Sequence, residues 1–509
     1  MRTPRTSTVL VLAGLAAAPL VALATPASGA TCAAPVRYAA SSSRIYVAGP
    51  ASVTLSDIAR LCPSAPLRLV DPATRTWQLD ADLVLERGAV LRLHGSESGG
   101  DVDVLRLASG SSGAVADVVT VTAQYGTLDV RDTEITSWDP VTAAPDTNPA
   151  IPAGGTRGRA FVRALSFLEG GTPRESRMDI ARSDLGHLGY NGAEAYGVAY
   201  KARGCGETTP QVCDVLDVLG SQVNSRFHHN FMGTYTWGAL GMRFTGNTYD
   251  ANVSYGLDPH DDSDELTVTG NSFHDNGNHG FICSKRCNDL VITGNRSSRN
   301  GVTPYVGPDD VDPSDNQVHG IMLHRGVTNS VIADNEVSGH PNGAGIAIFD
   351  SVGNVVRDNR VSDNRYGLRF SVGTRGTTVT GNTVSGSSQY AVFSYRGTDV
   401  PAYTGTSGRP SDITFTGNTF AGSGSDLFKV QDSDRFTFTG GAVRGPMASG
   451  PRFERSAGHV YDVSVATPVG TTFTLRGTSQ VRTTVTFRGI RPTAVKVSRD
   501  AFSTAVFTG

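Results

Sequence analysis

Short apolar segments recur along nearly the whole chain, and each is bounded by glycine, serine, asparagine or aspartate. Residues 102–107 (VDVLRL) and 118–122 (VVTVT) show the type: brief, rich in β-branched or alternating apolar side chains, and closed by turn formers. Long stretches with helical spacing of apolar residues are missing. The pattern therefore predicts an all-β protein built from many short strands.

A repeated unit containing asparagine gives these strands an order. Its first clear copies are Thr-Gly-Asn247, Thr-Gly-Asn271 and Thr-Gly-Asn295, and later copies place asparagine at 335, 359, 382 and 418. Most steps are about 24 residues, and insertions explain the two longer ones. Because the leucine-rich consensus is absent, we predict a right-handed parallel β-helix, a solenoid with coils of about 24 residues. The asparagines are expected to stack as a ladder in equivalent turns.

A second repeat, a glycine followed by an apolar residue, aligns the strands after each asparagine turn. It places in one row, predicted to face the core, Leu257, Phe281, Ile321, Ile346 and Leu368. Side chains alternate along a strand, so the second and fourth positions after each glycine should face outward. The outward pairs are Tyr235 and Trp237, Asp258 and His260, Ile282 and Ser284, Met322 and His324, Ala347 and Phe349, and Arg369 and Ser371. This strip of aromatic, acidic and basic side chains is typical of a polymer-binding groove.

The N-terminus has the features of a secretory signal over residues 1–30. Arg2 and Arg5 precede an apolar run, and small residues mark a cleavage site near Ala30, so we expect a secreted, extracellular protein. The formal net charge of −3, without a basic stripe, argues against a nucleic-acid partner. No later apolar stretch is long enough to predict a membrane span, and we expect a monomer.

We divide the mature chain into three regions. Residues 31–75 are predicted to cap the open end of the helix, 76–400 to form the catalytic β-helix, and 401–509 to form final coils or a small β module. An even number of cysteines in an exported chain favours disulfides. Their order suggests the pairs 32–62, 205–213 and 283–287.

The segment Tyr255-Gly-Leu-Asp-Pro-His260-Asp261 concentrates the side chains able to do chemistry. An ordinary polar turn or a calcium loop are alternatives, since Asp262, Asp264 and Glu265 follow. The acidic run lacks the spacing of an EF-hand, however, and no nonapeptide calcium repeat is present. We therefore expect no required cofactor and no bound metal, and leave calcium open.

Proton abstraction beside a carboxylate needs a base, a cation and an acid on the opposite face. His260 is the preferred base because histidine titrates near neutral pH, with Asp258 orienting it or tuning its protonation. The phenol of Tyr255 can return a proton. For the cation, Lys285 aligns with Asp261 one coil along, and Arg286 follows it. Further side chains on or beside the strip are expected to bind substrate: Lys201, Tyr235, Trp237, Asp261, His279, His319, His324, Arg325 and Arg369. For the two strand-initial histidines, 279 and 319, stacking on Tyr255 is the alternative.

Residues 177–290 resemble the mannuronan C-5 epimerases, bacterial enzymes that modify alginate. The matching stretches are Arg177-Met-Asp-Ile, His187-Leu-Gly-Tyr, residues 246–261 (GNTYDANVSYGLDPHD) and 279–285 (HGFICSK). The resemblance implies a right-handed β-helix whose groove binds an acidic polysaccharide, a polyuronate such as alginate. It also implies His260 as base, Tyr255 or water as acid, and Lys285 facing the substrate carboxylate. The family usually has arginine at that last position, and here Arg286 comes one residue later.

Our leading hypothesis is therefore a polyuronate C-5 epimerase that converts mannuronate to guluronate. A polysaccharide lyase is the first alternative, because it needs the same base and cation. The two reactions differ only after the carbanion forms: in a lyase it expels the group bonded to the neighbouring carbon. A β-helix that binds carbohydrate without catalysis is a third possibility. Glycosidase chemistry through Asp258 and Asp261 ranks last, because a three-residue spacing predicts opposite sides of one strand. The acidic insertion 302–317 is predicted to form a lid beside the groove.

Overall fold

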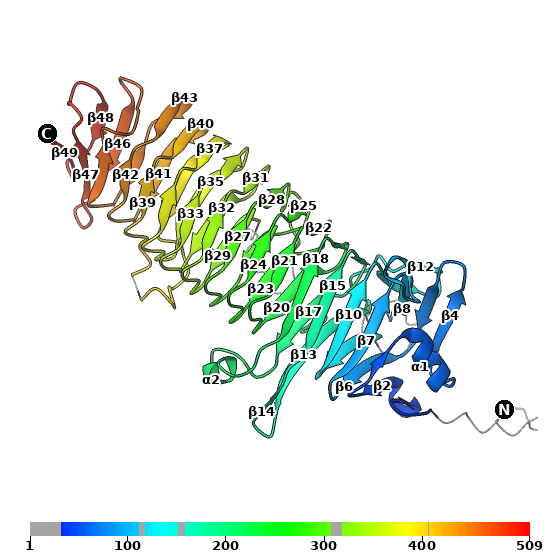
Figure 1. Ribbon diagram of the computed structural model, residues 1–509. Helices are drawn as coiled ribbons and strands as arrows, with labels where there is room; N and C mark the ends of the chain where they lie inside the picture. Colours follow the sequence, from blue (N-terminus) through cyan, green and yellow to red (C-terminus); the bar gives the residue numbers. More distant parts are fainter. Residues whose placement is uncertain (1–31, 111–117, 151–157, 307–317, 406) are drawn as a thin grey trace, which may run out of the picture.

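The computed structural model describes residues 32–110, 118–150, 158–306, 318–405 and 407–509. The predicted signal peptide and residues 307–317 of the predicted lid lie outside the described residues. Figure 1 shows one elongated stack of strands with α1 (Leu55–Leu61) near its N-terminal end and β49 at the other. The two α-helices of the described chain, α1 and α2 (Pro210–Cys213), are each far too short to cross a bilayer.

Three sheets run the length of the stack, and along the repeats each coil adds one strand to every sheet. Sheet 1 has 18 strands in the described chain: β1 (Val36–Ala39), β2 (Arg44–Ala48), β6 (Asp82–Glu86), β9 (Thr120–Gln124), β13 (Phe161–Glu169), β14 (Thr172–Arg174), β17 (Gly197–Ala202), β20 (Met232–Trp237), β23 (Leu257–His260), β26 (Phe281–Cys283), β29 (Ile321–His324), β32 (Ala344–Phe349), β35 (Tyr366–Ser371), β38 (Tyr390–Tyr395), β41 (Phe428–Gln431), β44 (Arg452–Glu454), β46 (Thr472–Arg476) and β48 (Lys496–Arg499).

Sheet 2 has 16 strands over the same described residues: β3 (Ser52–Val53), β7 (Ala89–His94), β10 (Gly126–Arg131), β15 (Arg177–Ala181), β18 (Leu219–Val223), β21 (Arg243–Thr245), β24 (Thr267–Thr269), β27 (Val291–Thr293), β30 (Val331–Ala333), β33 (Val355–Arg357), β36 (Thr378–Thr380), β39 (Thr414–Thr416), β42 (Thr437–Thr439), β45 (His459–Asp462), β47 (Thr483–Arg488) and β49 (Ser503–Thr508).

Sheet 3 has 15, again counted where the chain is described: β4 (Leu67–Asp71), β5 (Thr76–Leu79), β8 (Val104–Ala108), β11 (Glu134–Asp139), β12 (Ala144–Pro145), β16 (Asp184–Gly186), β19 (Arg226–His228), β22 (Thr248–Asp250), β25 (Ser272–His274), β28 (Arg296–Ser298), β31 (Glu336–Ser338), β34 (Arg360–Ser362), β37 (Thr383–Ser387), β40 (Thr419–Asp426) and β43 (Ala442–Ser449). Neighbouring coils pair in parallel, which confirms the predicted all-β solenoid.

The predicted alignment of strands in sheet 1 is confirmed by the register. The row expected to face the core pairs in sequence, Leu257 with Phe281, Phe281 with Ile321, and so on to Leu368. All five side chains of that row are buried. Outward positions also pair as expected, including Tyr235 with Asp258 and Trp237 with His260. Residues far apart in the chain therefore lie in one strip on the outer face of sheet 1.

The asparagine ladder is present and buried. The side-chain amide of Asn247 donates to the side-chain oxygen of Asn271 at 3.0 Å, and the same contact continues to Asn295, Asn335, Asn359, Asn382 and Asn418. Each amide also donates to a backbone carbonyl, as Asn295 does to Val268 at 2.8 Å. A second ladder begins at Asn230 and runs through residues 252, 276 and 300. These bonds satisfy buried turn groups that water cannot reach.

Asn295→Ala is expected to lower the free energy of unfolding substantially. The substitution leaves the Val268 carbonyl and the backbone amide of Asn271 without their buried partner, at a cost of about 1–3 kcal/mol for each group. Urea denaturation followed by far-ultraviolet circular dichroism measures the shift. The exposed Asn191 offers a control, since Asn191→Ala should leave the midpoint in place. Equal midpoints for the two variants would contradict a stabilising ladder.

Both ends of the described part of the chain are built into the same sheets. At the start, β2 pairs in parallel with β6, β1 pairs antiparallel with β2, and α1 begins with a capping box between Thr54 and Asp57. At the other end, β46 pairs with β48 and β47 with β49, all in parallel. Residues from 401 onward thus extend the stack of coils.

The three predicted disulfides form: Cys32 with Cys62, Cys205 with Cys213, and Cys283 with Cys287. No free cysteine is left in the described chain. Such pairing is typical of proteins that fold outside the cytoplasm. The Cys205–Cys213 bond closes the loop that contains α2, and Figure 1 shows this loop standing out from the stack.

Candidate active site

His260 is the last residue of β23 and lies on the outer strip of sheet 1. Its ring stacks on the indole of Trp237 in the neighbouring coil, with centroids 5.4 Å apart and planes 15° apart. The ring of Tyr235 lies 5.6 Å away on the same strand as the tryptophan. The histidine side chain keeps 31% of its surface exposed, so a substrate can reach it.

Asp261 orients this ring. Its carboxylate makes a short hydrogen bond with Nδ1 of His260 and is itself almost fully buried. β23 ends at His260, so Asp261 lies just beyond the strand along which side chains alternate. Of the two roles expected for Asp258, orienting the histidine or tuning its protonation, the second agrees with the structure. Asp258 accepts a hydrogen bond from Ser284 at 2.8 Å and acts on the ring through its charge.

The charges around His260 favour its protonated form. Burial lowers the pKa of His260, but the hydrogen bond to Asp261 and the charge of Asp258 outweigh burial, so the pKa is raised above its ordinary value of 6.5. Burial raises the pKa of Asp261, and its contacts with His260, Lys285 and Arg286 outweigh that effect and lower it. Burial raises the pKa of Asp258 to about 6. The structure therefore holds an ionised Asp261 against a readily protonated histidine.

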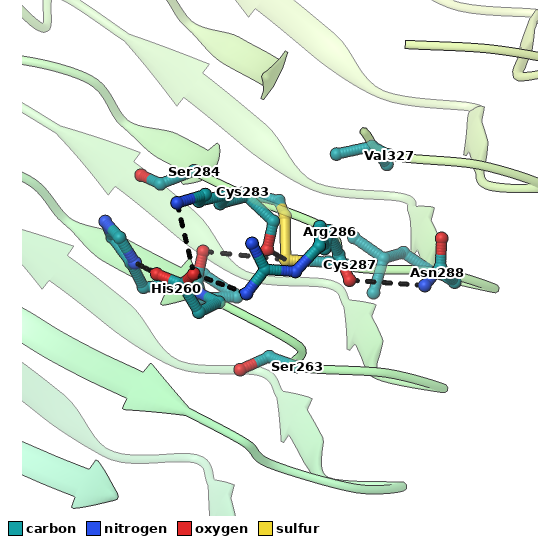
Figure 2. Close-up of a disulfide and its surroundings, with 12 residues drawn as sticks. His260, Ser263, Cys283, Ser284, Arg286, Cys287, Asn288 and Val327 are labelled. Carbon is teal, nitrogen blue, oxygen red and sulfur yellow. Dashed lines mark hydrogen bonds and ion pairs between the residues drawn. A yellow bond between two sulfur atoms is a disulfide. The ribbon is translucent and has the colours of Figure 1, made fainter. Parts of the chain in front are cut away.

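Lys285 and Arg286 approach Asp261 from the next coil. Arg286 donates to Asp261 at 2.7 Å and makes two bonds to Asp262, at 2.9 and 2.7 Å. In Figure 2 the guanidinium of Arg286 points toward the side of His260, beside the Cys283–Cys287 disulfide. The ammonium of Lys285 is 3.7 Å from Asp261. Arg286 is fixed by hydrogen bonds to Asp261 and Asp262, whereas the close partner of Lys285 is the more exposed Glu207. Lys285 is therefore the cation better placed to meet a ligand.

Two residues that make contacts at this site were not predicted from the sequence. Glu207, in the loop closed by Cys205–Cys213, bonds Lys285 at 2.5 Å and lies 3.8 Å from Arg286. The hydroxyl of Tyr403 donates to Glu207 at 3.1 Å and accepts from Arg286 at 3.4 Å. Both partners come from insertions between strands, where the repeat pattern offers no register.

The predicted acid, Tyr255, stacks on His279 with ring centroids 5.3 Å apart. It packs between two apolar clusters on the outer face of sheet 1, one around Tyr235 and one around Ile282. His279 and His319 are buried, and each accepts a backbone N–H at 2.9 Å through Nδ1. Burial lowers the pKa of both imidazoles well below the usual range, so they are neutral. His279 thus stacks on Tyr255, as the alternative expectation has it, and His319 stacks in turn on His279.

The remaining predicted substrate contacts spread along the strip. Lys201 lies over the Trp237 ring at 4.4 Å and pairs with Glu194 at 3.6 Å. On the other side of His260, His324 packs edge-on against Phe349. Arg369 covers the same phenylalanine at 4.9 Å and bonds the Tyr395 hydroxyl. Arg325 has a half-exposed side chain whose nearest acid, Asp399, is 3.9 Å away.

Comparison with known proteins identifies several that are similar to this chain in sequence. A family model described as the periplasmic copper-binding protein NosD matches residues 218–425. The chain is 31% identical over 146 residues to a mannuronan C5-epimerase of Pseudomonas fluorescens, covering 28% of this chain and 24% of the relative. It is 29% identical over 219 residues to the mannuronan C5-epimerase AlgG of Azotobacter vinelandii, covering 42% and 36%. It is 26% identical over 323 residues to a mannuronan C5-epimerase of Pseudomonas putida, covering 62% and 53%.

This chain resembles the mannuronan C5-epimerases. Its matches span between about a quarter and about half of the length of those relatives. In three dimensions it is similar to the periplasmic alginate epimerase AlgG, with a TM-score of 0.62 and 19% identity over 83% of this chain and 85% of that one. At this identity the likeness shows the β-helix fold shared with the epimerase.

The raised pKa of His260 predicts the pH dependence of any reaction in which this histidine acts as the base. A base must be unprotonated, so activity should fall as the pH drops through the pKa of His260, with a midpoint above 6.5. Asp261→Asn removes the charge that favours protonation, and the midpoint should move to lower pH. The pH profile of kcat/KM measures it. Asp275→Asn is the control, because Asp275 pairs in the same way with His274 on sheet 3. A midpoint that stays in place in Asp261→Asn would contradict this account.

Proposed function

We propose that the protein abstracts the C5 proton of a uronate residue in an acidic polysaccharide and acts as a mannuronan C5-epimerase on alginate. One observation supports this most directly: a partly exposed histidine is held by an ionised aspartate, beside a lysine, on the outer strip of a β-helix. The sequence and fold resemblances point to the same reaction class.

In this proposal His260 is the base. With Nδ1 bonded to Asp261, Nε2 takes the proton from C5, and Asp261 stabilises the imidazolium that forms. The electron pair left on C5 delocalises into the uronate carboxylate, which becomes an enolate-like dianion. The ammonium of Lys285 faces that dianion and stabilises it. Arg286 keeps Asp261 in position from the other side.

Reprotonation of C5 on the opposite face completes the epimerisation. Tyr255 is our candidate for the proton donor, and Tyr235 is a second phenol beside His260. Burial raises the pKa of Tyr235 well above its usual range, so this phenol carries its proton at neutral pH. Comparing Tyr255→Phe with Tyr235→Phe assigns the role: the variant without the donor should keep C5 exchange with solvent but lose inversion.

The polymer lies along the strip in this proposal. Trp237 offers an aromatic face for a sugar ring, and Lys201 beside it offers a charge to a neighbouring carboxylate. Arg369 and Arg325 extend this charge toward the C-terminal coils. The protein acts without a required cofactor, as a monomer exported by cleavage near Ala30. The alginate epimerase that shares its fold is described as periplasmic.

The decisive experiment is incubation of polymannuronate with the protein in deuterated water, followed by NMR. Deuterium at C5 together with guluronate signals is the expected result. A lyase would instead create a double bond, which ultraviolet absorbance detects. A rise in absorbance without guluronate would replace the epimerase by the lyase, and no exchange at all would favour a binding protein.

Glu207→Gln is expected to lower KM for polymannuronate. The Glu207 carboxylate is bonded to the ammonium of Lys285 and lies in the position that we assign to the substrate carboxylate. The substrate must therefore displace Glu207. The side chain is more than half exposed and can withdraw into solvent. Glu169→Gln, which alters an exposed acid paired with Arg174, is the control. An unchanged KM with a fall in kcat would show that Glu207 positions Lys285 instead.

A further inference from the structure

Three histidines gather on a corner of the solenoid where sheet 3 turns toward sheet 1, outside the proposed active site. His187 follows β16, His228 ends β19 in the next coil, and His229 follows it. One ring nitrogen from each lies within 4.8 Å of the other two. The His187 and His229 rings stack with centroids 5.0 Å apart, and His228 meets both edge-on.

A carboxylate and a glycine hold the His228 ring in place. Gly186 is its register partner on β16, and a Cβ there would lie 2.5 Å from Cε1 and Nε2 of the imidazole. Because glycine leaves this space, the ring lies across the strand, and its Nε2 bonds Asp184 at 2.6 Å. Nδ1 then faces Nδ1 of His229 at 2.8 Å. A histidine fixed by a carboxylate through one nitrogen, with the other directed at a cluster, is a recurring arrangement of metal ligands.

His187 has one unsatisfied ring nitrogen. Among the described residues its Nδ1 is buried and lacks a hydrogen-bond partner. Such a group costs free energy unless something binds it. The backbone conformation at this corner does not require histidine. The φ angle is 60° for His187 and 52° for His229, and other residue types adopt such values. The corner positions of the following coils have a similar φ with other residues, Ala251, Asp275 and Arg299.

We propose that His187, His228 and His229 bind one late first-row divalent metal ion of the Zn²⁺ type, with Asp184 orienting His228. Imidazole nitrogen suits Zn²⁺, Cu²⁺ and Ni²⁺. In a tetrahedral site with metal–nitrogen bonds of about 2.0 Å, ligand nitrogens lie roughly 3.3 Å apart. The three rings therefore need only small rotations. On binding, the proton between the two Nδ1 atoms is given to solvent and Nε2 of His229 takes one up, so that both rings coordinate as neutral imidazoles through Nδ1. Water completes the coordination.

Charged groups of both signs surround the cluster: Asp184, Arg159, and Arg226, which lies 3.9 Å from Asp184. The Arg159 guanidinium donates to the His229 carbonyl at 2.8 Å and opposes a cation. Its other donors are engaged by the carbonyls of Gly189 and Leu188. Asp184 supplies a compensating negative charge directly to the cluster.

Titration of chelator-treated full-length protein with ZnCl₂, followed by isothermal calorimetry, tests the site. We expect one equivalent bound per chain in the wild type, and its loss in His228→Ala and in His187→Asn, where asparagine tolerates the positive φ. Asp184→Asn should weaken binding by about 10–100-fold. His274→Ala, which removes another surface histidine bonded to an aspartate, should bind as the wild type does.

Two results would overturn the proposal. One is the absence of Zn²⁺ binding by the folded wild type, which would leave the three rings as a stacking ladder between coils. The other is one equivalent still bound by folded His228→Ala and His187→Asn. Co²⁺ gives an independent readout, because its visible absorption reports tetrahedral nitrogen ligands and should vanish in both variants. Circular dichroism of each variant separates lost ligands from lost fold.

Discussion

His260→Gln is expected to reduce deuterium incorporation at C5 of polymannuronate by about 10²–10⁴-fold, the usual contribution of a positioned general base. Glutamine retains much of the size of histidine and can still hydrogen-bond Asp261, so the groove keeps its shape. It cannot accept a proton from carbon. Binding of the polymer should therefore change little while turnover is lost.

His274→Gln is the matched control for this variant. His274 ends β25 on sheet 3 and bonds the following aspartate, Asp275, at 2.8 Å, so it reproduces the histidine–aspartate pair on a different sheet. Exchange at the wild-type rate in His274→Gln and its loss in His260→Gln would assign the chemistry to β23. Exchange that persists in His260→Gln would remove His260 from the mechanism.

The second large effect is expected from Lys285→Met, which should lower kcat by about 10²–10³-fold, as the loss of one group stabilising a developing charge does. Methionine keeps the length and apolar stem of lysine and removes only the charge. Since C5 abstraction produces a dianion, the effect should fall on kcat more than on KM. Initial rates from NMR time courses measure both.

Lys285→Arg should restore much of the rate, because a guanidinium supplies the same charge at this strand end. Lys496→Met, on the exposed end of the stack in β48, is the control for the loss of one positive charge. If Lys285→Met kept the wild-type kcat, Arg286 would have to neutralise the substrate carboxylate. That outcome would require Arg286 to leave Asp261 or Asp262 during turnover.

The sequence was informative where the structure is periodic. Each coil repeats the same sequence pattern, with a core residue after a glycine and an asparagine at the turn. Because the pattern repeats, counting along the chain predicts which residues become neighbours. Trp237, His260 and Ser284 are therefore placed on one strip by the sequence pattern alone. The disulfide pairs followed in the same way, because each closes a local loop.

The partners of the site could be found only in three dimensions. Glu207 meets Lys285 across 78 residues of chain, and Tyr403 meets Arg286 across 117. Both belong to insertions, whose paths are set by tertiary contacts: the carboxylate of Asp350, for example, accepts the backbone amides of residues 402–404. No repeat constrains such segments, and their side chains contact whatever the folded coils present.

The segment from Tyr255 to Asp261 shows the contribution of the repeat pattern and that of the tertiary structure. Periodicity alone determined that it lies on the outer face, with His260 between Trp237 and Ser284. Tertiary structure decided that Asp261 orients the histidine, because strand alternation stops at His260 and the turn brings the next carboxylate back to its ring. A repeat specifies positions within strands, whereas the geometry where a strand ends depends on the residues that pack there.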